Sequence, residues 1–367
     1  MTTAHLMDSQ PPSPAAGTKD VEITVVSGSD VAARQETWSR LWSELPPGPI
    51  GADPRWLAIL RDGLGHRPYG LEAHVAGQLQ AILPLAYVAT PLFGRFLVSL
   101  PFVSSCGVLA ADESLVMPLL NRAVQLADEL RVKHLELRLE RPLEHPDFQP
   151  SAANKILMRR TLPATSDALW KEIDSKVRNQ IRKGEKQGFD VQWGGQDRLE
   201  SFYRVFSRNM RDLGTPVFPR RFFAGILSHF GPDAEFCTVS LKEQPVAAAL
   251  LLHGRGTTKV PCASALREFS ATNANMFMYW QLLKRAVERG QTTFDFGRST
   301  IGSGTERFKA QWDAEAAPAH WISYVRDGRR TDLRKESATF ALLSRAWKLL
   351  PLPVAEFLGP RIVRGIP

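Results

Sequence analysis

The residues with the clearest potential for chemistry form a basic run between positions 175 and 188. A helix turns by about 100° per residue, so it would place Arg178, Arg182 and Lys186 on one stripe. This stripe borders an apolar face that contains Val177 and Ile181. A cationic stripe beside a core face is expected to line a cleft, where guanidinium groups can bind a phosphate through paired hydrogen bonds. The alternative is a solvated basic surface, which charge runs usually form.

A second candidate site begins where a hydrophobic strand around residue 294 opens into a glycine-containing loop. Its chemistry-bearing positions are Asp295, Gly297, Arg298, Gly302, Gly304 and Lys309, followed by Trp312. Glycines let the backbone approach a ligand closely, so Gly302 and Gly304 are candidates for contact with a phosphate-bearing donor. The loop lacks the Lys-Ser/Thr ending of a nucleotide-binding P-loop. Taken alone, Lys309 and Trp312 would be interpreted as ordinary surface and core residues.

A third candidate is the start of the helix that carries Tyr279. Asn273 and Asn275 lie at its N-terminus, where free backbone N–H groups and the helix dipole favour a pyrophosphate or a carboxylate. Every helix has such an end, and simple capping by either asparagine is the alternative. If the site transfers a group from a phosphate-bearing donor to a second substrate, the acceptor, we assign Tyr279 and Trp312 to the cleft that receives this acceptor.

The composition narrows the class of protein. The 367 residues carry a formal net charge of +8, which favours anionic partners such as nucleotide phosphates, nucleic acid, an acidic polymer or anionic lipid. Three cysteines without a C-x-x-C pair predict a reducing compartment, and we expect a cytoplasmic protein. The sequence has no H-E-x-x-H and no G-x-S-x-G motif, so we expect neither a metal site nor a serine nucleophile. Direct attack by a bound amine on an activated acyl group is then the economical mechanism.

Two halves with the same order of elements must position these residues. Each is expected to run strand, strand, strand, helix, strand, and the triplet Arg122-Ala123-Val124 recurs 163 positions later as Arg285-Ala286-Val287. The sequence therefore predicts an α/β (α+β) fold made of two similar domains in tandem, each a mixed sheet flanked by helices. The expected divisions are a disordered leader over 1–20, an N-terminal domain over 21–160, a C-terminal domain with the main site over 161–325, and a tail over 326–367.

Hydrophobic periodicity predicts the surrounding helices. A helix near 115–130 is expected to bury one face, made of Met117, Leu120, Val124 and Ala127. Ser166 is expected to cap one continuous helix over 167–187. Two further amphipathic helices are expected near 199–213 and 220–230.

The tail changes from basic to apolar along its length. Its basic part contains Arg326, Arg329, Arg330, Arg334 and Lys335, and its apolar part runs from Trp347 to Val354. We expect the tail to pack on the C-terminal domain, since its prolines interrupt a long helix. The alternative is a peripheral anchor at the inner membrane, because cationic residues beside Trp and Leu suit an anionic lipid surface.

Four segments, in the same order along the chain, resemble the FemAB-like branch of the GNAT-type acyltransferase superfamily. Within that branch the chain is most similar to FemAB proteins associated with exosortase and PEP-CTERM systems. The segments are residues 176–183, residues 209–216, residues 294–299 with Phe308, Lys309 and Trp312, and the tail at 350–353 and 358–360.

The resemblance implies a tandem pair of GNAT-like domains, with the active cleft between them and formed mainly by the second. It implies transfer of an acyl or aminoacyl group to an amine, from acyl-CoA or aminoacyl-tRNA as co-substrate, with no bound cofactor. Lys309 matches the family position that stabilises charge at the reacting carbonyl. The sequence lacks the Q/R-x-x-G-x-G/A coenzyme A loop ahead of Asn275, which leaves the identity of the donor open.

On this hypothesis the chain is an N-acyltransferase of exopolysaccharide or cell-envelope assembly, with an amino sugar or envelope precursor as acceptor. Its catalytic residues are Lys309 at the oxyanion and Asp295 or Arg298 as orienting groups for the acceptor. Two alternatives remain. One is a non-catalytic module that binds a polysaccharide or a lipid-linked intermediate, and the other is a protein that binds tRNA or other nucleic acid through its basic helix.

Overall fold

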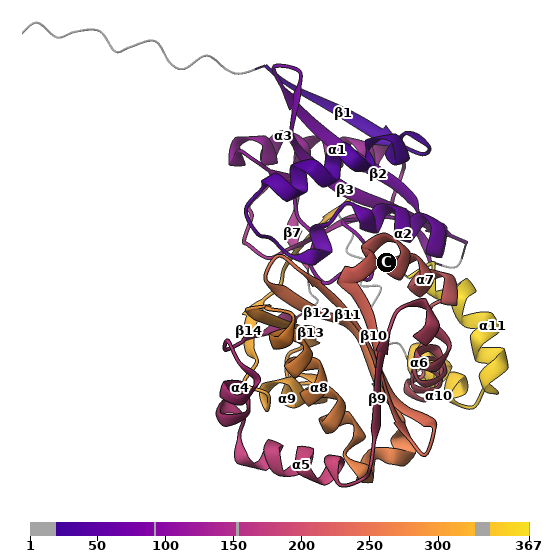
Figure 1. The fold of residues 1–367 in the computed structure, drawn as a ribbon. Coiled ribbons are helices and arrows are strands. Elements are labelled where there is room, and N and C mark those ends of the chain that lie inside the picture. The colour runs from indigo at the N-terminus through magenta and orange to yellow at the C-terminus, as the bar shows by residue number, and fades with distance from the viewer. Residues whose placement is uncertain (1–19, 92, 152–153, 327–337, 367) are drawn as a thin grey trace, which may run out of the picture.

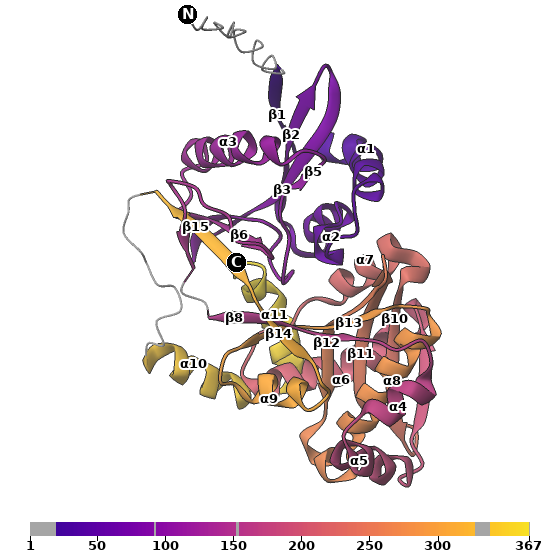
Figure 2. The same ribbon diagram turned by 90° about the vertical axis from the view of Figure 1, so that its left-hand side faces the viewer.

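The chain folds into two β-sheets, each flanked by helices, which lie one above the other in Figure 1 and Figure 2. The computed structural model describes residues 20–91, 93–151, 154–326 and 338–366. The expected leader therefore lies outside the described residues except for its last position. The same holds for four residues of the basic tail, Arg329, Arg330, Arg334 and Lys335.

In the first half, five antiparallel strands precede a crossover helix. Its elements are β1 (Val21–Ser27), α1 (Asp30–Glu44), α2 (Arg55–Leu64), β2 (Arg67–Val75), β3 (Gln78–Thr90), β4 (Gly94–Val98), β5 (Leu109–Ala110), α3 (Val116–Glu129), β6 (His134–Leu139) and β7 (Gln149–Pro150). Strands β1 to β4 are antiparallel neighbours, and α3 carries the chain to β6, which lies parallel to β4. Helices α1 and α2 cover one face of the sheet and α3 covers the other (Figure 2), so each face has its own core.

The second half repeats this order. Its elements are β8 (Lys155–Thr161), α4 (Ser166–Glu172), α5 (Ser175–Glu185), β9 (Asp190–Gly194), α6 (Leu199–Leu213), α7 (Arg220–Phe230), β10 (Ala234–Leu241), β11 (Gln244–Gly254), β12 (Thr257–Ala265), α8 (Ala274–Glu288), β13 (Thr293–Thr300), α9 (Gly304–Ala310), β14 (Glu315–Pro318), β15 (His320–Val325), α10 (Ala338–Lys348) and α11 (Leu352–Val363). Strands β9 to β12 are antiparallel neighbours, and α8 carries the chain to β13, which lies parallel to β12. The two Arg-Ala-Val triplets lie on α3 and α8, the equivalent crossover helices. The predicted fold class is confirmed.

The two halves exchange strands. Strand β8, which precedes residue 162, pairs with β13 in the second sheet, whereas β15 returns to pair with β6 in the first sheet. Residues on both sides of the expected boundary at 160 therefore contribute to the other half's sheet. This reciprocal pairing joins the halves through backbone hydrogen bonds in addition to side-chain packing.

The helix expected over 167–187 is interrupted. Ile173 is extended, with ψ of 135°, and Asp174 caps α5 by accepting the Lys176 N–H at 2.7 Å. Thr165 rather than Ser166 caps α4. The single-helix prediction was wrong because the apolar spacing continues through the break, while the aspartate competes for the backbone N–H groups that a continuous helix would use.

One buried-face prediction also differs from the structure. Met117 of α3 is 39% exposed. The helix packs instead through a neighbouring stripe of five residues, Leu119, Leu120, Ala123, Leu126 and Ala127. Its face is therefore rotated by part of a turn from the expected one.

Candidate active site between the two halves

A cavity of about 310 Å³ lies where two parallel strands of the second sheet separate. Strands β12 and β13 pair only as far as Lys259 and Asp295, although both strands continue beyond that point. The cavity occupies the gap, with walls from β12, β13, α8 and α9 of the second half. Trp56 of α2 and residues 102–104 close it from the first half. The cavity is therefore built by both halves.

Lys309 of α9 brings a buried ammonium group to this cavity. The residue is 7% exposed, and its Nζ donates to the carbonyl oxygens of Gly297 at 3.1 Å and Arg298 at 2.8 Å. An ammonium group has three N–H donors, so one is left for a ligand in the cavity. Burial is the main cause that lowers the pKa of Lys309 to about 8. Asp295 opposes this shift, while the cations Lys259 and Arg298 add to it.

A β-bulge in β13 creates the pair of carbonyl groups that hold this ammonium. Between the pairs Asp295–Arg159 and Arg298–Leu157, two residues of β13 face one residue of β8. Gly297 has φ of 75°, a left-handed conformation that glycine adopts without the steric cost of a Cβ. Its N–H donates to Asp295 Oδ1 at 2.7 Å, which stabilises the bulge.

Asp295 lies behind the cavity wall as a buried counter-ion. It is 2% exposed, and its Oδ2 lies 3.0 Å from Lys259 Nζ and 3.6 Å from Arg159 Nε. Burial raises the pKa of the Asp295 carboxyl, whereas the two cations and the Gly297 N–H lower it. The lowering is the larger effect, so the pKa lies below its ordinary value. Both carboxylate oxygens have partners in the second half. Asp295 therefore suits the positioning of Lys259 and Gly297, and direct contact with an acceptor does not fit this placement.

Arg298, predicted to orient the acceptor, and Tyr279, predicted to lie in the acceptor cleft, both line the cavity, whereas Trp312 does not. The Arg298 side chain is exposed, with its guanidinium carbon 5.6 Å from the centre of the Trp321 ring. Tyr279 stacks on Phe296 with ring centroids 5.9 Å apart, and burial raises its pKa. Trp312 is fully buried 6.0 Å from the Tyr279 ring, so it supports that ring from the core.

The two loop glycines shape the start of α9 and do not line the cavity. Ser303 caps α9 by accepting the Glu306 N–H at 3.2 Å, and the Glu306 carboxylate accepts the Gly302 N–H. Gly302 has φ of 79°, which permits the turn, and Gly304 begins the helix. The loop thus orients α9 and, with it, Lys309. A direct phosphate contact by these glycines in the cavity does not fit this arrangement.

The basic stripe lies on α5, outside the cavity wall. The Arg182 guanidinium carbon lies 5.4 Å from the centre of the Trp170 ring, and Arg178 donates to the Trp170 carbonyl at 3.5 Å. Lys186 is exposed at the end of the helix. Trp170 therefore supports two of the three cations on the surface.

Helix α5 packs against the first turn of α8. A Cβ on Gly184 would lie 2.9 Å from Phe277 Cβ and 3.3 Å from the Asn273 carbonyl oxygen, so glycine permits the close approach. Asn273 has φ of 59° and makes no side-chain capping bond, and Asn275 is half-buried. The structure thus brings the basic helix beside the N-terminus of α8, and neither asparagine lines the cavity.

Sequence reasoning missed Lys259 and the walls that the first half supplies. Lys259 is 4% exposed, lines the cavity and pairs with Asp295. Its only signal in the sequence is that it is the single charged residue of its strand. Trp56 and Ser104 reach the cavity from the first half, and no local pattern could have placed them opposite β12.

The equivalent gap in the first sheet is filled by protein. Strands β4 and β6 pair as far as Val98 and Glu136. Strand β4 ends there, and the backbone of Cys106 then bridges Arg138 of β6, whose side chain is 1% exposed and donates to Glu136 Oε1 at 2.8 Å and to the Val103 carbonyl at 3.1 Å. Its guanidinium carbon lies 4.5 Å from the centre of the Trp321 ring. At this position only the second of the two duplicated gaps is open in the described structure.

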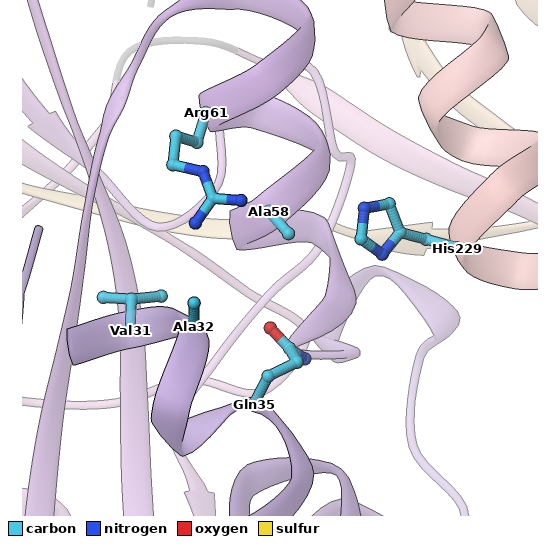
Figure 3. A pocket seen from close by; sticks show the side chains of 6 residues that line it. All are labelled: Val31, Ala32, Gln35, Ala58, Arg61 and His229. Atoms are coloured by element: carbon cyan, nitrogen blue, oxygen red, sulfur yellow. The ribbon is translucent and has the colours of Figure 1, made fainter. Parts of the chain in front are cut away.

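A smaller hollow of about 170 Å³ lies between α1, α2 and α7 (Figure 3). Two of its lining residues, Arg61 and His229, can carry charge, and Arg61 pairs with Asp62 at 2.7 Å. None of the site residues expected from the sequence lines it.

Across the described residues, no group of three or more His, Cys, Asp or Glu side chains is placed to hold a metal ion. In the same part of the chain, the helices are too short or too polar to cross a bilayer.

Residues 172–310 match the family model described as an acetyltransferase (GNAT) domain. The matched segment contains α5, the β12–β13 gap and Lys309. A solved structure of FemX is 14% identical, with a TM-score of 0.62, over 79% of this chain and 96% of that chain. A tandem GNAT protein from the clavulanic acid biosynthesis pathway is 10% identical, with a TM-score of 0.50, over 83% of this chain and 98% of that chain. The fold is a tandem pair of GNAT-like domains.

A third similar structure is that of L-PGS from Bacillus licheniformis. It is 13% identical, with a TM-score of 0.55, over 84% of this chain and 96% of that chain. No curated protein sequence matches the chain.

Proposed function

We propose that the chain is an N-acyltransferase that joins an acyl or aminoacyl group to an amine acceptor. The observation that carries this proposal is the buried Lys309 ammonium, which lines the cavity and is held by two backbone carbonyls of the GNAT-matched segment. Preorganised donors of this kind stabilise the negative charge that develops on a reacting carbonyl oxygen. Lys309 is therefore proposed as the oxyanion donor.

In the proposed reaction a neutral amine attacks the carbonyl carbon of an activated acyl group. The C–N bond forms while a carbonyl electron pair moves to oxygen, and the remaining N–H of Lys309 donates to that oxyanion. When the intermediate collapses, the C=O bond reforms and the bond to the leaving thiolate or ribose oxygen breaks. The attacking nitrogen releases one proton to solvent, and the leaving group takes up one proton if it departs as an alkoxide.

The donor is proposed to present its phosphate groups to α5 and the start of α8. Support comes from Arg178, Arg182 and Lys186, which lie on the helix that packs beside Asn273. Tyr279 lines the cavity five residues beyond Ala274, or about 7.5 Å of helix rise. A donor held at the helix start and extended along α8 would therefore place its acyl group in the cavity. Acyl-CoA and aminoacyl-tRNA both carry the necessary phosphates.

The acceptor is proposed to be an amino sugar or a cell-envelope precursor, in exopolysaccharide or envelope assembly. This class rests on the resemblance of the sequence to FemAB proteins. The cavity supports it through aromatic walls, Trp56 and Phe102 from the first half and Phe296 from the second, because aromatic faces suit the apolar side of a sugar ring.

The test compares wild-type protein with Lys309→Met and Lys309→Arg, using acyl-CoA and aminoacyl-tRNA donors and mass spectrometry of the amide product. Loss of the oxyanion donor should lower turnover about 10²-fold or more in Lys309→Met, with partial recovery in Lys309→Arg. Thr305→Val changes the same cavity wall without removing charge and serves as the matched control. Near-normal turnover of Lys309→Met would remove this residue from the mechanism. Wild-type protein that binds a polysaccharide but forms no amide would support the binding-module alternative.

A further inference from the structure

The last two helices carry most of the exposed large apolar side chains of the described chain. Nine such side chains are exposed in the described residues, and five of them belong to α10, α11 and the turn between them. Their exposed fractions are 66% for Leu342, 62% for Leu343, 85% for Leu349, 40% for Val354 and 61% for Phe357. Single exposed apolar residues are ordinary, but a gathering of them marks an interaction surface.

The inner faces of both helices are fixed to the body of the protein. Gly214, after α6, abuts Ser344 of α10, and Arg211 donates to the Leu350 carbonyl at 3.0 Å. On α11, Gly359 abuts Val217. Both helices lie along α6 at one side of the second half (Figure 1). The apolar outer residues are therefore held in place on a folded element.

The outer faces follow from helical geometry. On α11, Ala355, Gly359 and Val363 are buried, and Phe357 falls about 160° around the helix from the middle of that face. Arg361 and Arg364 project on the same outward side as Phe357. On α10, Leu342 lies about 160° around the helix from Ser344, and Leu349 follows in the turn where the helix has ended. Each helix is attached by one face and presents apolar residues on the other.

The charges around these residues are almost all positive. Residues 338–366 contain four basic residues and one acidic residue. The basic residues are Arg345, Lys348, Arg361 and Arg364, all exposed. The acidic residue, Glu356, lies 3.5 Å from Arg220 and is thus partly neutralised. Arg361 covers the Phe357 ring at 3.9 Å, the arrangement in which an apolar group enters an interface while a cation stays at its surface.

We propose that α10 and α11 form a docking surface for an anionic lipid bilayer. Apolar side chains projecting between basic ones, on helices of 11 and 12 residues that are too short to span a bilayer, are the features of a segment that lies in the membrane interface. The apolar side chains would enter the boundary between headgroups and acyl chains, and the four cations would attract anionic headgroups. This surface is independent of the Lys309 cavity and does not rest on the proposed acyl transfer.

The test is sedimentation of the full chain with vesicles of phosphatidylcholine alone and of phosphatidylcholine mixed with phosphatidylglycerol. Binding should occur to the mixed vesicles and weaken as salt is added. Leu349→Ser and Phe357→Ser should each lower the partition coefficient about tenfold. Arg345→Gln and Lys348→Gln should each lower it about fivefold. Met117→Ser and Arg40→Gln remove an exposed apolar and an exposed basic side chain elsewhere and should have no effect.

Two outcomes would overturn the proposal. The first is failure of the wild-type chain to bind the mixed vesicles, or equal binding by Phe357→Ser and Met117→Ser. The second is self-association without vesicles that Phe357→Ser abolishes, because the surface would then be an interface between two copies of the chain. Thermal unfolding of each variant controls for folding, and these exposed substitutions should leave the melting temperature close to the wild-type value.

Discussion

Replacing Lys309 with methionine should change how the stability of the protein depends on pH. Burial lowers the pKa of Lys309 from 10.5 to about 8 in the folded chain. In the unfolded chain the lysine keeps its ordinary pKa, so between these two values the unfolded state binds more protons than the folded state. The free energy of unfolding therefore rises with pH through this window. The destabilisation caused by burying the charged ammonium is present in full when the pH is below the pKa of Lys309 in the folded state. It disappears as the pH rises toward the pKa of the lysine in the unfolded state.

The magnitude follows from the two pKa values. One unit of pKa difference corresponds to about 1.4 kcal/mol, and going from about pH 7 to about pH 9.5 covers most of the window. The wild-type free energy of unfolding should gain about 2 kcal/mol over this range relative to Lys309→Met, which has no group to titrate. Groups common to both proteins cancel in the difference, so the comparison isolates Lys309.

The assay is urea unfolding of both proteins at several pH values within this range. Lys183→Met, which removes an exposed lysine of α5, is the matched control and should follow the wild-type pH dependence. Parallel curves for wild type and Lys309→Met would refute the assignment of a buried ammonium with a lowered pKa.

Three other predictions concern the surroundings of the cavity. Lys259→Met should lower the free energy of unfolding by about 3 kcal/mol, because it leaves the buried Asp295 carboxylate without its closest cation. Urea unfolding of the double variant Lys259→Met, Asp295→Asn should show that part of this loss is recovered. Gly297→Ala should lower the free energy of unfolding by about 1 to 2 kcal/mol, because Gly297 has a positive φ. It should also lower turnover, because it would move a carbonyl group that holds the Lys309 ammonium. Unchanged turnover would count against that role. Arg182→Ala should raise the KM for a phosphate-bearing donor while leaving kcat within a few-fold, and steady-state kinetics with equal KM values would exclude the phosphate site on α5.

Much of the fold could be predicted because its signals are local. The apolar spacing of α3, α6 and α7, and the recurrence of one triplet on two crossover helices, depend only on neighbouring residues in the chain. The same spacing failed at Ile173, where a cap at Asp174 interrupts the helix without interrupting the apolar pattern. In the sequence, a single capping residue is a weaker signal than hydrophobic periodicity. Its side chain nevertheless decides where the helix ends, because it competes for the backbone hydrogen bonds.

The sequence by itself determined the duplicated α/β topology and the basic character of α5, and it singled out the segment from Asp295 to Lys309 as a candidate site. Only the tertiary structure decided that Lys309 and Arg298 share a cavity with Tyr279, while Trp312 remains in the core. It also placed Lys259 against Asp295, because strands far apart in sequence meet there in parallel register. Contacts of this kind depend on strand pairing and on packing between halves, and neither leaves a periodic trace in the chain.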